Sequence, residues 1–215
     1  MGVVAKRSSM MFYTSNNDHY GHSIKIVLAE KGVAVDVIEA ALTQIPAEVM
    51  QFNPHKTLPI LVDRDLILHE QNVIMEYLDE RFPHPPLLPV YPVARAQSRM
   101  WIHRIQRDWS TRVDAILGGK LNDAEKEKYR EELLDSFASV SPIFSHKPYF
   151  MSDDFTLVDC CVAPILWRLS ELEIELPKKK CAHLAAYADR LFRRISFQAS
   201  LSKLDADKMK DLFVV

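Results

Sequence analysis

Glycine and cysteine are both scarce in this chain of 215 residues, which has five glycines and three cysteines. Glycine supplies the tight turns that hold phosphate groups, so its scarcity argues against a glycine-rich phosphate loop and favours a helical chain. Three cysteines, of which Cys160 and Cys161 are adjacent, are too few for a disulfide framework. The cysteine content fits a reducing compartment, and we therefore expect a cytoplasmic protein.

The sequence also lacks a surplus of either charge and lacks a long hydrophobic run. Lys and Arg number 27 and Asp and Glu number 29, a formal net charge of -2, so no overall positive field favours a nucleic-acid backbone. No window approaches the ~18 consecutive apolar residues of a membrane-spanning helix. We therefore expect neither sequence-specific nucleic-acid binding nor membrane attachment. The 48% hydrophobic content is enough to bury a globular core.

Strand and helix signals alternate over residues 9–88. Apolar runs at 10–13 and 33–38 predict two strands, and a helix with period 3.6 at 20–31 lies between them and ends before Gly32. A right-handed crossover makes these two strands parallel, and a hairpin then adds an antiparallel edge. The remaining elements expected here are a short helix at 46–50, hairpin strands at 58–62 and 66–68, and a helix at 71–81.

Five of the twelve prolines lie between Pro83 and Pro92, and this density excludes regular helix or internal strand. We interpret it as a domain boundary and expect domains at 9–88 and 89–215. The second domain shows helical periodicity and no strand signal. Its expected helices span 93–117, 123–140, 157–171 and 182–195. The predicted fold class is an α/β domain followed by an all-α domain.

Two positions in the first domain are candidates for ligand binding. Pro59 stands at the head of a strand, where it either occupies an edge or follows a cis peptide bond that leaves the backbone of Leu58 facing a cleft. An ordinary strand-start proline is the alternative. Glu70 opens the helix at 71–81, where a carboxylate is favoured by the helix dipole. It either caps that helix or accepts a ligand amine.

Other polar motifs have structural interpretations. Thr156 and Asp159 have the spacing of a capping box, with Phe155 placed for a hydrophobic staple, so we assign residues 155–159 to stability. Cys160 and Cys161 are expected in the core. His19 and His22 have a spacing compatible with a metal but lack a third ligand, so we expect surface histidines and no metal site.

Arginines give the helix at 93–117 a local positive excess. Arg95 and Arg99 share a helical face and Arg104 lies away from them, so they form no continuous stripe for reading DNA. Solvated or ion-paired arginines are the expected state, and acidic protein partners suit them better than nucleic acid. The arginines concerned are Arg95, Arg99, Arg104, Arg107 and Arg112. The basic loop 178–180 is too short to indicate nucleic acid.

Taken together, Leu58–Pro59, Glu70 and residues 155–159 resemble the glutathione transferase family. This resemblance implies a thioredoxin-like domain followed by a helical domain. Within that family, longer segments resemble the stringent starvation protein A family of bacterial RNA polymerase-associated regulators. The segments that carry this closer resemblance are 26–32, 61–65, 75–95, 102–109 and 158–160.

The resemblance allows the transferase chemistry to be compared with these residues. Family enzymes place Ser, Cys or Tyr at the start of the first helix to stabilise a thiolate, whereas alignment through residues 25–28 puts Asp18 there, and a carboxylate repels a thiolate. Nearby hydroxyl groups remain open as substitutes: Tyr13, Ser15, Tyr20 and Ser23. We expect no catalytic residue and no efficient transferase activity. A glutathione transferase or thiol reductase is the alternative class.

The ligand side of the site also departs from the family. The family follows the acid with Ser or Thr, whereas Gln71 follows Glu70 here. Its side chain is longer and would reach a different place. The expectation is therefore no cofactor, with weak glutathione binding left open through Leu58, Pro59, Glu70 and Gln71. A sensor of another small metabolite is a third possibility.

The segment 83–92, called the proline segment below, is an interdomain linker on composition alone. Its prolines fix the backbone and lower the entropy lost on binding. The resemblance implies that this surface binds RNA polymerase and its primary sigma factor, in a homodimer that regulates transcription under starvation or stress. The residues expected to contact the partner are Pro83, His84, Pro85, Pro86, Tyr91 and Arg95.

Overall fold

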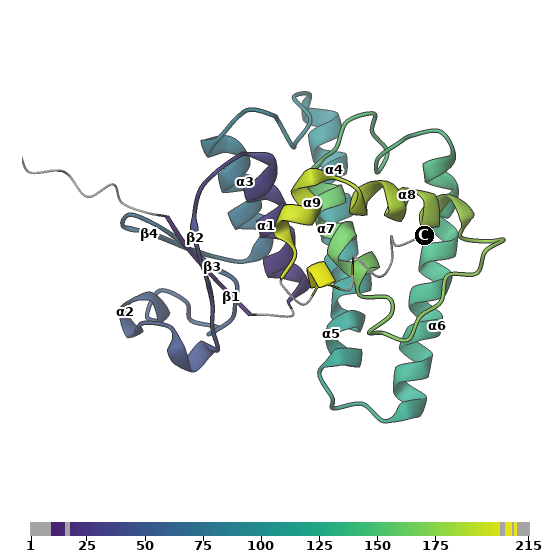
Figure 1. Ribbon diagram of the computed structural model, residues 1–215, viewed down its shortest axis with the longest axis horizontal. Helices are drawn as coiled ribbons and strands as arrows, with labels where there is room; N and C mark the ends of the chain where they lie inside the picture. The colour runs from purple at the N-terminus through teal and green to yellow at the C-terminus, as the bar shows by residue number, and fades with distance from the viewer. Residues whose placement is uncertain (1–9, 16–17, 203–204, 208, 210–215) are drawn as a thin grey trace, which may run out of the picture. The chain divides into compact units, whose positions relative to one another are not determined.

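The computed structural model describes residues 10–15, 18–202, 205–207 and 209. The chain divides into two compact units. Of the described residues, those up to His84 and those after Leu201 belong to the first unit, and Pro85–Leu201 form the second. Figure 1 shows a small sheet in the first unit and helices throughout the second.

The first unit is built on a four-stranded sheet with the strand order β2-β1-β3-β4. β1 pairs with β2 in parallel and with β3 in antiparallel orientation, and β3 and β4 form the predicted hairpin. The strands are β1 (Met11–Thr14), β2 (Asp36–Glu39), β3 (Ile60–Asp63) and β4 (Leu66–His69). The described residues thus confirm a thioredoxin-like mixed sheet.

Two helices, α1 (His19–Glu30) and α3 (Gln71–Arg81), pack against each other on one side of this sheet (Figure 1). The 3-10 turn η1 (Leu42–Gln44) and the short helix α2 (Ala47–Met50) lie on the other side. There Ile45 and Val49 join a small core with Tyr13, Ile60 and Val62.

The start of α1 approaches the end of β1 so closely that only glycine fits. A Cβ atom on Gly21 would lie 1.8 Å from Thr14 Oγ1. At the other end, Gly32 has φ +62, a left-handed conformation that suits the predicted end of the helix.

Buried polar contacts fix the last turns of α3. Lys31 Nζ lies 2.6 Å from Asp79 Oδ1, with the lysine side chain fully buried. On another side, Tyr77 Oη donates to Asp63 Oδ2 at 2.6 Å and Arg81 Nε donates to the same oxygen at 3.2 Å. The helix therefore ends in a fixed direction just before the proline segment.

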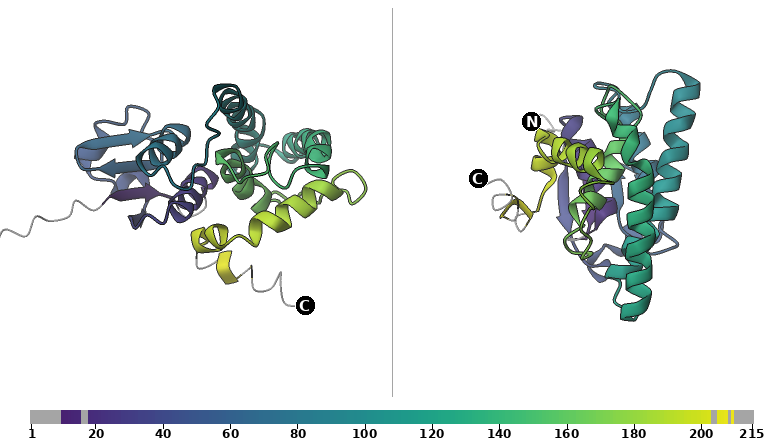
Figure 2. Two further views of the ribbon diagram at one scale, coloured as in Figure 1. Left: turned by 90° about the horizontal axis from the view of Figure 1, so that it is seen from above. Right: turned by 90° about the vertical axis from the view of Figure 1, so that its right-hand side faces the viewer.

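The second unit is helical. α4 (Pro92–Ile105), the π-helical turn η2 (Gln106–Ser110) and α5 (Thr111–Leu117) form one continuous helix, which runs beside α6 (Asp123–Val140) in Figures 1 and 2. The other elements are η3 (Ser141–Ser145), α7 (Leu157–Trp167), α8 (Ala182–Phe192) and α9 (Ile195–Ser200). In the described part of this unit the only β pairing is a bridge between Tyr149 and Ser152.

The predicted capping box at the start of α7 is present and belongs to a buried network. Asp159 Oδ2 accepts hydrogen bonds from Thr156 N at 2.8 Å and Thr156 Oγ1 at 3.0 Å. Its Oδ1 accepts from Phe150 N at 2.8 Å and Tyr187 Oη at 2.6 Å. Burial raises the pKa of Asp159 even though these hydrogen bonds oppose the rise. Every residue of α7 is buried, so this network lies in the core.

Several predicted boundaries were wrong. The second strand begins at Asp36 rather than 33, because its pairing starts opposite Met11 in the short β1. The helix expected at 93–117 contains the π-helical turn, and the one at 157–171 ends at Trp167. The helix expected at 182–195 is split, because the extended backbone of Arg194 separates α8 from α9.

The two units meet in the chain at Pro85 rather than at residue 89. Leu87 and Leu88 are buried, and Leu87 O accepts a hydrogen bond from Leu157 N at 2.8 Å, which ties this part of the proline segment to α7. No helix within the described ranges has both the length and the apolar character needed to cross a bilayer.

Candidate functional site

The four residues expected to bind a ligand gather at one end of the sheet. Ile60 pairs with His69 across the hairpin, and Ile60 also pairs with Tyr13 of β1. Leu58–Pro59 and Glu70–Gln71 flank the first pair, so both segments lie at the end of the sheet from which α1 also begins. The strand register, rather than proximity in sequence, therefore assembles the site.

Leu58 enters β3 through a cis peptide bond to Pro59, as one of the two predicted alternatives requires. Asn53 Nδ2 donates to Thr57 O at 2.6 Å and holds the preceding loop. Among the described residues, none hydrogen-bonds the backbone N–H or C=O of Leu58. These groups are available to pair with an extended ligand backbone.

Glu70 does not cap α3, so that interpretation was wrong. It adopts φ +73 and ψ 119, and its side chain makes no capping hydrogen bond. The side chain is 61% exposed, and its Oε1 lies 3.6 Å from His69 Nδ1. Gln71, the first residue of α3, is buried. The carboxylate of Glu70 is therefore exposed and makes no hydrogen bond to the start of α3.

His69 also lies at this site, although it was not among the site residues predicted from the sequence. Its ring lies 6.4 Å from that of His55, in an edge-to-face arrangement. The signal was present, because His69 directly precedes the candidate acid Glu70, but a histidine in a strand pattern carries little weight alone. Two imidazole rings therefore lie at this end of the sheet, and one of them is next to the carboxylate of Glu70.

At the start of α1, Asp18 acts as the helix cap. Its two carboxylate oxygens accept hydrogen bonds from Tyr20 N and Gly21 N, each at 2.9 Å. These N–H groups and the positive end of the helix dipole are what would lower the pKa of a thiol bound there. In this chain the carboxylate of Asp18 occupies them.

The substitutes for the missing activating group are largely engaged elsewhere. Tyr13 is buried in the sheet core and its hydroxyl donates to Met11 Sδ at 3.7 Å. Ser23 is buried and donates to His19 O at 2.9 Å. Ser15 and Tyr20 are half-buried. Ser15 and Tyr20 are therefore the more accessible of the four hydroxyl groups.

The two histidines of α1 and the three cysteines are all buried. His19 and His22 are buried, so the expectation of surface histidines was wrong. No group of three or more His, Cys, Asp or Glu side chains among the described residues could hold a metal ion. The three cysteines are free and buried, as expected for Cys160 and Cys161, and burial raises the pKa of the Cys161 thiol.

The proline segment combines buried anchors with exposed apolar groups. Leu87 and Leu88 are buried, and Arg95 Nε donates to Pro89 O at 3.0 Å, which fixes the segment against the start of α4. Within it, the exposed fractions of Val90 and Tyr91 are 74% and 79%, and Val93, which follows the segment in α4, is 73% exposed. The prolines at its start and His84 are also exposed: Pro83, His84, Pro85 and Pro86.

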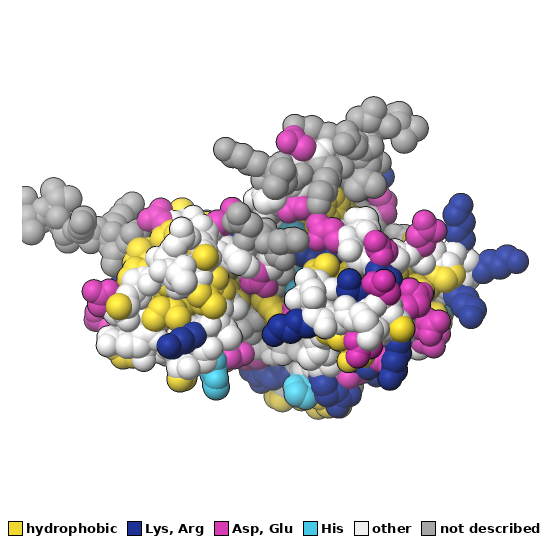
Figure 3. All heavy atoms as spheres, turned by 90° about the horizontal axis from the view of Figure 1, so that it is seen from below, with side chains coloured by type: hydrophobic (Ala, Val, Ile, Leu, Met, Phe, Trp, Pro, Cys, Tyr) yellow, Lys and Arg dark blue, Asp and Glu magenta, His cyan; other side chains and the backbone are white. Residues whose placement is uncertain are grey.

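Figure 3 shows hydrophobic side chains gathered on the first unit and charges of both signs interspersed on the second. The exposed large hydrophobic residues of the first unit include Leu42 and Phe52. Single exposed apolar residues are normal, whereas three large ones within positions 90–93, where the proline segment joins α4, are not.

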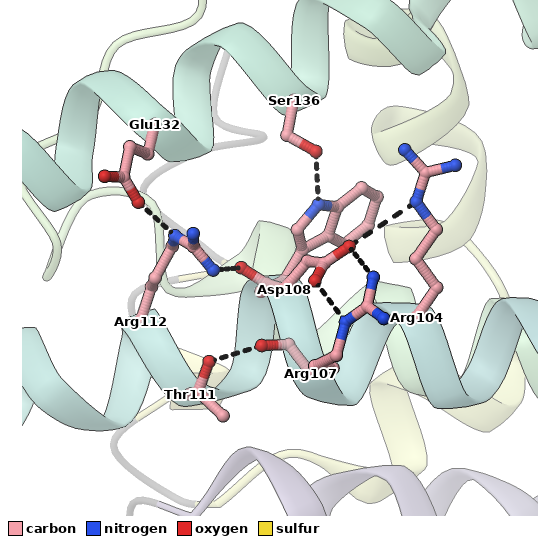
Figure 4. Close-up of polar contacts among 8 residues, drawn as sticks. Arg104, Arg107, Asp108, Thr111, Arg112, Glu132 and Ser136 are labelled. Atoms are coloured by element: carbon pink, nitrogen blue, oxygen red, sulfur yellow. Dashed lines mark hydrogen bonds and ion pairs between the residues drawn. The ribbon is translucent and has the colours of Figure 1, made fainter.

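Most of the predicted arginines are ion-paired. Arg107 donates to both carboxylate oxygens of Asp108, at 2.8 and 3.2 Å, and Arg104 Nε lies 3.5 Å from the same carboxylate (Figure 4). Arg112 pairs with Glu132 of α6 at 2.7 Å. Hydrogen bonds from Arg107 lower the pKa of Asp108. We call these five residues the arginine cluster.

Comparison with known proteins decides the family. A model of the glutathione S-transferase N-terminal domain matches residues 12–86, and a model of the C-terminal domain matches residues 101–194. The stringent starvation protein A homolog of Coxiella burnetii is 48% identical over 94% of this chain and 96% of its own length. The chain belongs to the stringent starvation protein A family. The homolog of Pasteurella multocida is 46% identical over 91% of this chain and 92% of its own.

Solved structures support the fold of this stringent starvation protein A family member. A tau-class glutathione S-transferase from mango has a TM-score of 0.80 at 23% identity, covering 96% of this chain and all of that one. Rice GST1 in complex with glutathione has a TM-score of 0.81 at 22% identity, covering 98% of this chain and 100% of that one. At this identity the likeness establishes the fold alone, as predicted.

Proposed function

We propose that this protein is an RNA polymerase-associated transcription regulator of the starvation and stress response. In this proposal it is a cytoplasmic homodimer that binds polymerase and its primary sigma factor through the proline segment, without efficient glutathione transferase activity. Its membership of the stringent starvation protein A family supports the proposal. The observation that carries it is the exposure of Val90 and Tyr91 on an anchored, proline-fixed backbone.

The proline segment has the physical properties of a docking surface. Proline fixes φ, and the hydrogen bond from Arg95 to Pro89 removes further freedom, so little entropy remains to be lost on binding. Tyrosine buries a large apolar area at low entropic cost and is enriched among residues that dominate binding energy. Tyr91 is therefore the expected apolar anchor, with His84 as a polar contact.

The start of α1 supports the absence of efficient catalysis. Asp18 occupies the N–H groups that would stabilise a glutathione thiolate, and its charge repels one. The buried cysteines supply no substitute nucleophile. The chain thus keeps the fold of the transferases while lacking their usual thiolate-stabilising group at this position.

A specific observation favours a second, lesser function in binding glutathione. The unpaired backbone of Leu58 suits the peptide backbone of such a ligand, and the exposed carboxylate of Glu70 suits its amino group. Gln71 is buried where the family has Ser or Thr. We expect weak binding without turnover, and no cofactor is needed for the main function.

The test is binding of purified RNA polymerase carrying its primary sigma factor. The double variant His84→Ala with Pro85→Ala and the single variant Tyr91→Ala are expected to weaken binding about tenfold or more, because they remove central contacts. Ile195→Ala is the matched control, since Ile195 is 86% exposed and lies outside the segment. Equal recovery of polymerase by all variants would refute the docking surface.

A parallel assay separates the enzyme alternative. Turnover of glutathione with a model electrophile should stay near the uncatalysed rate. Robust turnover that is lost in Glu70→Ala would instead establish the protein as a transferase and reverse the proposal.

A further inference from the structure

Positive charge is concentrated just before α8 and along it. Residues 177–194 contain six Lys or Arg and one Asp, a formal charge of +5, whereas the whole chain has a net charge of -2. The basic loop 178–180 lies two residues before the helix, and this part of the chain projects from the second unit (Figures 1 and 2). The near-neutral composition therefore conceals one strongly basic segment.

The three lysine side chains of the basic loop are exposed, and none has a partner among the described residues. Their backbone is held in a turn, because Lys180 N and Cys181 N donate to Pro177 O at 3.1 and 2.8 Å. In the arginine cluster, by contrast, neighbouring carboxylates pair with the guanidinium groups. The basic loop therefore holds three ammonium groups close together whose charge no described residue neutralises.

The exposed side of α8 continues this positive charge. Arg190 and Arg193 are three residues apart and therefore lie on the same side of the helix, and both are exposed. His183 stands two turns before Arg190 on that side and is also exposed. The buried side is formed by Leu184, Tyr187, Ala188 and Leu191. We call residues 178–180, His183, Arg190 and Arg193 the basic face.

A single acid partly offsets this charge. Arg193 Nε donates to both carboxylate oxygens of Asp189, at 3.0 and 2.9 Å. Arg190 Nη1 donates to Pro148 O at 2.6 Å, which holds the guanidinium group without neutralising it, and Arg190 has no acidic partner within the described ranges. Asp189 is the only acid in residues 177–194. The basic face therefore keeps a net positive charge after its ion pair is counted.

The side chains between these charges favour a phosphate backbone over other anionic partners. No large hydrophobic side chain in residues 178–193 is exposed. An acidic protein or a bilayer surface would therefore lack the apolar contacts that such binding needs. Exposed aromatic rings, on which single-stranded bases stack, are also missing here, since Tyr187 is buried. Ala182 and Ala186 are exposed and small, so a rigid duplex can approach the helix closely.

The length of the basic face matches several nucleotides. His183 and Arg193 are about 15 Å apart along the helix axis, and successive phosphates of one DNA strand are about 3.4 Å apart along the duplex axis. α8 therefore runs past about four base pairs, and the basic loop extends the contact. The loop alone is too short to indicate nucleic acid, whereas the fold places Arg190 and Arg193 in line with it.

We propose that the basic face binds the phosphate backbone of double-stranded DNA without reading its sequence. Lysine side chains of the basic loop contact phosphates as point charges on flexible stems, and Arg190 supplies a guanidinium group that Pro148 holds in place. Such binding releases counterions, so it weakens steeply with salt. The inference goes beyond the proposed function and does not depend on polymerase.

The test measures binding of the purified full-length chain to a fluorescein-labelled DNA duplex by fluorescence anisotropy, between about 50 and 200 mM salt. The logarithm of the affinity should fall linearly with the logarithm of the salt concentration, and duplexes of different sequence should bind equally. Lys178→Gln with Lys180→Gln should weaken binding about tenfold at the lower salt and reduce the magnitude of the slope by about 2, because two phosphate contacts are lost.

The chain offers a matched control for the loss of charge. Lys120 and Lys128 are exposed, lie outside the basic face and have no partner in the described part of the chain. Lys120→Gln with Lys128→Gln removes the same charge and should change the affinity by less than about twofold. Asp189→Asn removes the acid beside Arg193 and should strengthen binding, whereas damage to the fold would weaken it.

Three results would overturn the proposal. The first is no measurable binding, or equal affinity and equal salt dependence of the wild type and the double lysine variant. The second is a glutamate-rich peptide that competes as well as the duplex, which would assign the basic face to an acidic protein. The third is a single-stranded thymidine oligonucleotide that binds as tightly as the duplex. Failure of polymerase binding leaves these measurements intact, because only the purified chain and DNA are present.

Discussion

Two helices of this protein begin beside an acidic residue, and the two acids have different fates. At the start of α7, Asp159 is fully buried and accepts four hydrogen bonds. At the start of α3, Glu70 is exposed and accepts no capping hydrogen bond. A buried acid at a helix start must have its hydrogen bonds made by the protein, so its role is structural. An exposed acid hydrogen-bonds to water and remains available to bind a ligand.

Replacing Asp159 should have the largest effect. Asp159→Ala leaves the N–H groups of Thr156 and Phe150 and the hydroxyl of Tyr187 without an acceptor in the core. Orphaned buried donors are costly, so we expect a loss of about 4 kcal/mol in the free energy of unfolding. Urea denaturation measures it. Asp153→Ala, at an exposed acid of the preceding turn, is the control and should cost little. A loss below about 1 kcal/mol for Asp159→Ala would mean that contacts other than those of Asp159 stabilise the start of α7.

Removing one hydrogen-bond donor to Asp159 should also destabilise the protein, by an amount that depends on pH. Tyr187→Phe deletes the 2.6 Å hydrogen bond to Asp159 and should cost about 1–3 kcal/mol. Burial raises the folded-state pKa of Asp159, so the stability linked to this group is present at acid pH and is lost as the pH rises through the folded pKa. Tyr187 opposes that rise by favouring the ionised form.

The loss in the free energy of unfolding caused by Tyr187→Phe should therefore be larger near neutral pH than near pH 4, because the carboxyl group of Asp159 is closer to being protonated at pH 4. Unfolding curves at several pH values between these limits give the comparison. Tyr149→Phe, which removes a half-buried hydroxyl contact with Arg194, is the control and should show no such trend. A cost for Tyr187→Phe that stays constant with pH would mean that Asp159 does not titrate in this range.

The sequence predicted the α7 start because the interactions are local. Thr156 and Asp159 stand three residues apart, and a capping box needs only that spacing. The hairpin and the helix after it were predicted for the same reason. Local patterns thus identified most elements, and their errors were mainly in where the elements end.

The conformation of Glu70 and the pairing of the arginines depend on residues distant in the chain. The register between Ile60 and His69 sets the backbone at Glu70, and Glu132 lies twenty residues after Arg112. The π-helical turn has no signal in a 3.6-residue period, because Ile105 just before it and Trp109 within it are both buried at a spacing of four residues, which an α-helix also gives. The backbone conformation of Glu70 and the ion pairs of the arginines therefore depend on contacts between distant parts of the folded chain, which residue spacing in the sequence does not predict.

The smallest predicted effect has the opposite sign. Glu70 holds φ +73 and ψ 119, a conformation that costs a side-chain-bearing residue about 1–3 kcal/mol, whereas glycine adopts it freely. Glycine also raises the conformational entropy of the unfolded chain, which destabilises the folded protein by about 1 kcal/mol. Glu70→Gly should therefore stabilise the protein by about 1 kcal/mol, the difference between these two effects, measured by thermal unfolding.

Arg64 is the matched control, because it has φ +57 in the hairpin turn, where a side chain is less strained. Arg64→Gly should gain less than Glu70→Gly. Glu70→Gly should at the same time abolish glutathione binding, because the carboxylate is lost. A variant that is more stable but binds no ligand would show that the strain at α3 is retained for the exposed acid. A destabilised Glu70→Gly would mean instead that this side chain supports the fold, as Asp159 does at α7.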